Sequence, residues 1–237
     1  MRDDIKIIVE FCRTKLDLAN AKLPDEYRYP HLPLCVIDAV FSIGVNYVST
    51  KNTVDRFCQH VGISKTSKIY PPDIVEQFSI AELIELYNRY GVEGMAKIVY
   101  QNLQRTSTRN GILKSEAVLR FSETLLQFGV NYLQDVNKIV GDPNFESAIT
   151  KIPGQRSGLS LRYFYMLVGS EEYVKPDRMI IRFIRSIIGK SPSIEEAHDI
   201  IVGTCEILKK EHPHLTPRLL DHLIWKYQRE KEQKGTG

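Results

Sequence analysis

The chain has 237 residues, enough for one large domain or two closely packed small ones, and its 43% hydrophobic and 26% charged residues are ordinary for a globular protein. No stretch reaches the roughly 18 apolar residues of a membrane span, and the two acids near the N-terminus do not fit a secretory or transit peptide. We therefore expect a cytoplasmic protein without a membrane partner. The four cysteines are far apart among hydrophobic residues, which predicts buried thiols, and neither they nor the six histidines have the spacing of a zinc site.

Apolar residues recur three and four positions apart along the whole chain, and alternating runs bounded by hairpin turns are missing from the sequence. The fold class that this pattern predicts is all-α. The segment 34–46 is apolar nearly all round, so we expect it to be a buried helix. The other helices are expected at about residues 3–19, 50–60, 71–78, 79–91, 92–104, 113–128, 145–150, 159–167, from Asp177 onward, at 194–210 and from Thr216 to the charged tail.

Residues 145–168 are expected to form a short apolar helix, a tight turn and a second helix. The turn contains Gly154 and Gly158, which permit positive φ values and let backbone N–H groups approach a partner closely. The free N–H groups at the start of the second helix, with Arg156 and Arg162 nearby, suit a phosphate oxygen. An ordinary loop in which a glycine caps a helix is the alternative interpretation.

An acid, Asp177, stands directly after a proline at the start of a basic helix. On that helix Arg178, Arg182 and Arg185 are spaced four and three apart, so they share one face. They belong to the segment 151–190, whose eight bases and three acids give a net charge of +5, against +3 for the whole chain. Contact with a DNA backbone is the favoured interpretation of the arginines, and a solvated surface face is the alternative. For Asp177 the alternative is a helix cap.

A hairpin, a Gly/Pro-rich turn and an aspartate about twenty residues further on together resemble the helix-hairpin-helix base-excision DNA glycosylases, the HhH-GPD superfamily. The apolar run Leu34–Ser42 is similar to the buried early helix of that family. The segment Asn110–Ala117 is similar to the one that begins the helix leading toward the hairpin. Order and spacing agree over about residues 32–228.

The resemblance implies a two-lobed helical fold with a central cleft, in which residues 1–33 and 136–237 form the hairpin-containing lobe and residues 34–135 form a helical bundle lobe. It implies a monomer that binds double-stranded DNA at a damaged or mispaired base, with Asp177 as the catalytic residue. The DNA-binding residues that it implies are Gly154, Gln155, Arg156, Ser157, Gly158, Arg162, Arg178 and Arg182. No cofactor or metal is expected.

Several positions depart from the family pattern. Gly154 and Gly158 are four apart, whereas family hairpins usually carry two glycines separated by one residue. Bifunctional members have a lysine just after these glycines, but this chain has Leu159 and Ser160 there, so we expect no lyase chemistry. The glutamine with which many members fill the gap left by a flipped base is missing after the early apolar helix. Cys205 is the sole cysteine after Asp177, so no iron–sulfur cluster is expected.

We therefore expect a DNA repair protein of the glycosylase type, nucleoid-associated within the cytoplasm, which acts as a monofunctional hydrolase of an N-glycosidic bond if it is an enzyme. An ionised Asp177 near C1′ would stabilise the cationic sugar and could orient the attacking water. An extruded base needs an aromatic or apolar pocket. The tyrosines available for it, with core packing as the alternative, are Tyr27, Tyr29, Tyr47, Tyr163 and Tyr165. The rival function is a non-catalytic DNA-binding or scaffold protein that keeps only the architecture.

Overall fold

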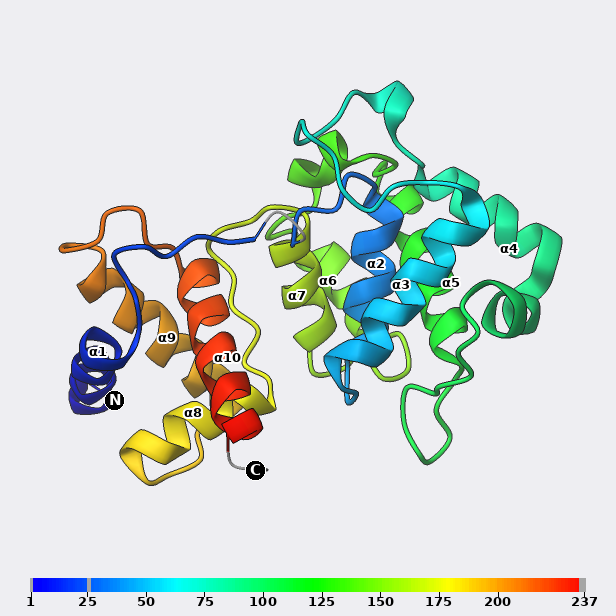
Figure 1. Cartoon of the computed structure of the whole chain (residues 1–237). Coiled ribbons are helices and arrows are strands. Elements are labelled where there is room, and N and C mark those ends of the chain that lie inside the picture. The colour runs from blue at the N-terminus through cyan, green and yellow to red at the C-terminus, as the bar shows by residue number, and fades with distance from the viewer. Residues whose placement is uncertain (1, 25–26, 235–237) are drawn as a thin grey trace. The chain divides into compact units, whose positions relative to one another are not determined.

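The computed structural model describes residues 2–24 and 27–234, and the regular elements of these residues are helices, with no strand beyond an isolated bridge between Arg105 and Leu113. The all-α prediction is therefore confirmed. The chain forms two compact units (Figure 1). We call Met1–Pro24 with Ser170–Gly237 the terminal unit and Asp25–Gly169 the central unit.

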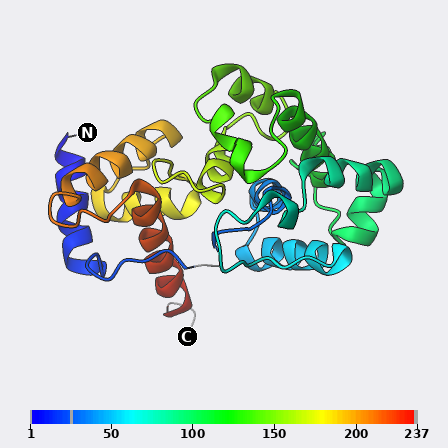
Figure 2. The same ribbon diagram turned by 90° about the horizontal axis from the view of Figure 1, so that it is seen from above.

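The terminal unit contains the first helix and the last three. Its helices are α1 (Arg2–Lys15), α8 (Arg178–Ile188), α9 (Ile194–Leu208) and α10 (Pro217–Lys234). Helix α1 packs against α8 and α9, as Figures 1 and 2 show. It can approach α9 closely because Gly203 has no side chain. A Cβ at this position would lie only 2.9 Å from Cδ1 of Ile5. The core of this unit combines residues from all four helices, including Ile8, Phe183 and Ile201.

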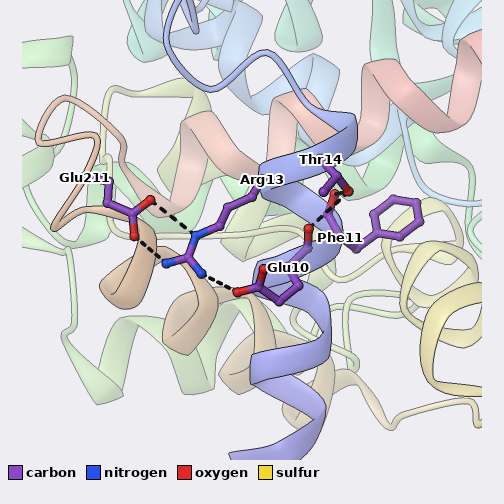
Figure 3. Close-up of polar contacts among 5 residues, drawn as sticks. All are labelled: Glu10, Phe11, Arg13, Thr14 and Glu211. Carbon is purple, nitrogen blue, oxygen red and sulfur yellow. Dashed lines mark hydrogen bonds and ion pairs between the residues drawn. The ribbon is translucent and has the colours of Figure 1, made fainter.

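Polar contacts fix the end of α1 to the turn after α9 (Figure 3). The Nε of Arg13 donates a hydrogen bond to Glu211 at 3.2 Å, and the same guanidinium forms ion pairs with Glu211 and with Glu10 one turn earlier. On the other side of the helix the ring of Phe11 packs edge-on against Phe183 and Tyr227. The beginning of the chain is thus attached to its last quarter through both apolar and charged contacts.

The central unit is built around one buried helix. All ten residues of α2 (Leu32–Phe41) are buried, as its all-round apolar sequence predicted. Three helices pack most closely around it: α3 (Tyr47–Val61), α5 (Lys114–Gln127) and α7 (Leu159–Leu167). The remaining elements of the unit are α4 (Ile80–Gly94), α6 (Pro143–Thr150), the short 3-10 helices Ile74–Glu76 and Leu133–Lys138, and a π-turn at Met95–Val99.

Helix ends follow the local capping signals closely. Ser79 and Glu82 form the predicted capping box of α4, and Ser193 forms the corresponding one of α9. Gly62 ends α3 with a left-handed φ of 74°. Gly91 is non-helical (φ 68°, ψ 170°), so the helix that begins at Ile80 is broken there, as predicted, and a second helical segment continues to Gly94 across this kink.

The helix expected at residues 92–104 is wrong over its second half. The π-turn ends at Val99, Gln101 has a φ of 47°, and the chain then forms a loop that returns at Lys114. The physical reason is that polar side chains supply alternative hydrogen bonds. Asn102, for example, accepts the N–H of Gln104 at 3.0 Å and donates to Thr53 at 2.9 Å.

The division into units differs from the predicted boundaries. The hairpin helices α6 and α7 belong to the central unit, because α7 packs on α2 and α6 packs on α5. The predicted boundaries placed this hairpin with the N-terminal helix. The four cysteines are buried free thiols, as their surroundings predicted, and burial raises the pKa of Cys12 to about 12.

Candidate functional site

The predicted hairpin is present as α6, a tight turn and α7. Two successive backbone hydrogen bonds shape the turn: Gln155 N–H donates to the carbonyl of Ile152, and Gly158 N–H donates to that of Gln155, both at 2.9 Å. Helix α7 then begins, with Gly158 as its N-cap. The φ values of 89° at Gly154 and 70° at Gly158 lie in the left-handed region, which explains why both positions are glycine.

The two glycines face different surroundings. A Cβ built on Gly154 would lie 2.3 Å from Cβ of Thr106, so the turn presses against the loop that connects the π-turn to α5. A Cβ on Gly158 would meet nothing within 4 Å. Gly154 is therefore required by packing within the central unit, while the side of Gly158 where a Cβ would be is open.

The polar residues of the turn divide into an exposed and a buried group. Arg156 and Ser157 are exposed, and Arg156 has no hydrogen-bond or ion-pair partner among residues 2–24 and 27–234. The side chain of Gln155 is only 2% exposed and accepts a hydrogen bond from the hydroxyl of Ser160. It therefore braces the hairpin internally and is not available to a DNA partner, unlike what the sequence suggested. Arg162 is half-buried on α7.

Asp177, in the terminal unit, is the N-cap of α8. Its Oδ1 accepts hydrogen bonds from the N–H groups of Met179 at 2.8 Å and Ile180 at 3.4 Å. The capping interpretation is thus correct as geometry. Both hydrogen bonds use this one oxygen, and within the described residues Oδ2 accepts none. The carboxylate is half-buried, so it combines a structural contact with a second oxygen that remains available.

Helix α8 is strongly two-sided. Ile180, Phe183 and Ile184 are buried in the core of the terminal unit. The arginines predicted to share the opposite face, Arg178, Arg182 and Arg185, are all exposed. A row of cations therefore follows Asp177 along the surface of α8.

The sequence did not reveal a set of contacts that hold the segment before Asp177. The carboxylate of Glu171 accepts hydrogen bonds from the hydroxyl of Thr216 at 2.8 Å and from Arg218 at 3.1 Å. The carboxylate of Asp221 on α10 accepts the backbone N–H of Lys175 at 3.0 Å. Helix α10 thus binds both ends of the segment 171–175. An acid among the apolar residues of its inner face, Leu220 and Ile224, is the signal that could have drawn attention to Asp221.

Asp221 is a buried acid close to Asp177. Burial is the main cause that raises its pKa to about 8, and the negative charge of Asp177 raises it further. The backbone N–H of Lys175 and the charges of Lys175 and Arg218 act in the opposite direction. At neutral pH Asp221 is therefore mostly protonated.

Another buried charge connects the two segments that carried the resemblance outside the hairpin. Lys114 is 2% exposed, and its Nζ donates to the carbonyl oxygens of Phe41 and Ile43, both at 2.8 Å. These carbonyls lie at the C-terminal end of α2, where a cation is favourable. Lys114 thus fixes the turn between α2 and α3.

Most of the candidate tyrosines serve the central unit itself. The hydroxyl of Tyr29 donates to Asp38 at 2.9 Å, and that of Tyr163 to the same carboxylate oxygen at 3.4 Å. Burial and the charge of Asp38 raise the pKa of Tyr29. Tyr165 is buried and donates to the carbonyl of Ile139 at 3.1 Å. These contacts agree with the core-packing alternative.

The described residues contain no helix long and apolar enough to cross a membrane. They also contain no group of three or more His, Cys, Asp or Glu side chains that could hold a metal ion. The chain is thus an all-helical protein of two compact units, with candidate residues in a hairpin turn and at a helix start. A family model described as "Domain of unknown function (DUF8548)" matches residues 6–229, so the chain belongs to this family. No curated protein and no solved structure matches it.

Proposed function

We propose that this protein binds double-stranded DNA and acts as a monofunctional base-excision glycosylase. The observation that carries the proposal is the start of α8, where an acid with an available oxygen is followed by exposed arginines. In its ionised form Asp177 would stabilise positive charge on a deoxyribose during cleavage of the N-glycosidic bond. Arg178 and Arg182 would contact the phosphates beside that sugar.

The hairpin of the central unit supplies the second part of the proposal. Its open Gly158, the N-terminus of α7 and the exposed Arg156 suit a phosphate oxygen. The HhH-GPD resemblance gives these two features one function, since hairpin and aspartate act on the same DNA in that superfamily. Because Leu159 and Ser160 occupy the positions of the Schiff-base lysine, the reaction would end at an abasic site.

Salt-dependent binding to undamaged duplex DNA tests the first step. Contacts to several phosphates make affinity fall steeply with salt, and Arg156→Ala or Arg178→Ala should each lower the slope of log affinity against log salt by about 1. The loss should be similar for all DNA sequences. The matched controls are Lys97→Ala for Arg156 in the central unit and Lys6→Ala for Arg178 in the terminal unit, since each also removes one exposed cation. Absence of salt-sensitive binding by the wild-type protein would refute the proposal.

Base release from a panel of duplexes with damaged or mispaired bases tests the second step. We expect release that stops at an abasic site and gives no borohydride-trapped covalent complex. The second candidate function is a non-catalytic DNA-binding protein, which the capping role of Asp177 favours. DNA binding without base release on any duplex would support that candidate against the enzyme.

A further inference from the structure

The backbone of Lys175 is held on both sides of its Cα, two residues before Asp177. Its N–H donates to Oδ1 of Asp221 at 3.0 Å, and its carbonyl accepts the N–H of Asp177 at 2.6 Å. The direction of the chain at Asp177 is therefore coupled, through the backbone of one residue, to a carboxyl on α10. Asp221 has 7% of its surface exposed, so this contact lies inside the terminal unit.

The same segment is also held at its other end. Besides the two side-chain contacts of Glu171, its carbonyl accepts the backbone N–H of Arg218 at 3.1 Å. Thr216 caps the first turn of α10, since the N–H of Leu219 donates to its Oγ1 at 3.1 Å. The first turns of α10 thus form a rigid support for the chain that leads to α8.

The charges around Asp221 explain why an acid can occupy this place. Asp177 and Lys175 act on it from the segment before α8, and Arg218 acts from α10 itself. Burial dominates, so the carboxyl keeps its proton up to a pKa of about 8. A neutral carboxyl still accepts the Lys175 N–H through one oxygen, and it places no second negative charge beside Asp177.

We propose that Asp221 is a positioning residue for Asp177, which it holds through the backbone of Lys175. The chemical meaning of this role rests on the proposed function, because Asp177 is the acid expected to face the sugar. Its test requires neither DNA nor base release. A failure of the positioning role and a failure of the glycosylase function can therefore be distinguished.

The first measurement is a carboxyl-carbon NMR titration of Asp177, with its signal assigned by comparison with Asp177→Asn. In the wild type we expect the Asp177 signal to shift near pH 8, when Asp221 ionises beside it. Asp221→Asn should abolish this shift. Glu171→Gln, which changes the other carboxylate of the same support, should keep it. Absence of the shift in the wild type, or its survival in Asp221→Asn, would overturn the proposal.

The second measurement is hydrogen exchange at the amides of Met179 and Ile180, which donate to Asp177. Asp221→Leu leaves the Lys175 N–H without its acceptor, and we expect exchange at these two amides to become about tenfold faster, the factor that one lost hydrogen bond gives. Amides at Phe183 and Ile184 should be unchanged, and Asp221→Asn should restore slow exchange. Unchanged exchange in Asp221→Leu would refute the coupling. If this variant does not fold, the Asp221→Asn titration decides alone.

Discussion

Replacing Gly154 with alanine tests whether the hairpin turn needs glycine for its own packing. A φ of 89° places an L side chain in the left-handed region, which costs about 1–2 kcal/mol. The new Cβ would also lie 2.3 Å from Cβ and 2.8 Å from Oγ1 of Thr106. Relieving such an overlap typically costs about 1–3 kcal/mol. We therefore expect Gly154→Ala to lower the free energy of unfolding by about 2–5 kcal/mol.

Gly158 provides the matched control, because its φ of 70° is similar and a Cβ there would meet nothing within 4 Å. Gly158→Ala should lower the free energy of unfolding only by the cost of a left-handed φ for an L residue, about 1–2 kcal/mol. The overlap at Gly154 involves three side-chain atoms of Thr106, all of which Thr106→Gly removes. In that background Gly154→Ala should lose its steric cost, so the double-mutant cycle should give a coupling of about 1–3 kcal/mol.

Urea unfolding followed by far-UV circular dichroism measures all four variants of the cycle and the Gly158→Ala control. The slope of the free energy of unfolding against urea concentration should be the same in all variants, so differences in the unfolding midpoint report differences in stability. Equal losses in Gly154→Ala and Gly158→Ala would refute the reasoning. So would a coupling to Thr106 indistinguishable from zero.

Three further predictions concern charged groups. The pKa of Asp221 is about 8 in the folded protein and 3.8 without these surroundings, so the folded state binds the proton more tightly. The free energy of unfolding of the wild type should therefore fall as pH rises from about 4 to 8, by on the order of 5 kcal/mol at most. Asp221→Asn should remove this loss, as measured by urea unfolding at several pH values. Lys114→Met should cost about 1–3 kcal/mol in chemical unfolding, because it leaves buried carbonyls at the end of α2 without a donor. Arg13→Ala should change the unfolding midpoint little in the same assay, because its partners Glu10 and Glu211 are exposed and water screens the ion pairs.

Features set by neighbouring residues could be predicted from the sequence. The caps at Ser79, Ser193 and Asp177 depend on side chains within three residues of the backbone groups that they bind, and the stop at Gly62 depends on the left-handed φ that glycine permits. The burial of α2 followed from its composition alone. These features need no knowledge of which helices become neighbours.

Features set by distant residues could not be predicted. The loop after the π-turn is stabilised by Thr53 and by the hairpin glycine Gly154, which are far from it in sequence. The role of Asp221 depends on α10 meeting a segment more than forty residues earlier. Gln155 is a similar case, because its polar side chain in a turn suggested exposure, whereas Ser160 provides a buried partner for it.

The capping and catalytic interpretations of Asp177 are compatible, and two substitutions separate them. Asn is about as good an N-cap as Asp, so Asp177→Asn should retain the hydrogen bonds from Met179 and Ile180 and change stability little. It removes the negative charge, so base release should fall by about a hundredfold or more, as for other lost electrostatic stabilisers. Asp177→Ala removes the cap as well and should cost a further 1 kcal/mol or so in urea unfolding. Base release that persists in Asp177→Asn while Asp177→Ala destabilises the protein would leave Asp177 with the structural role alone.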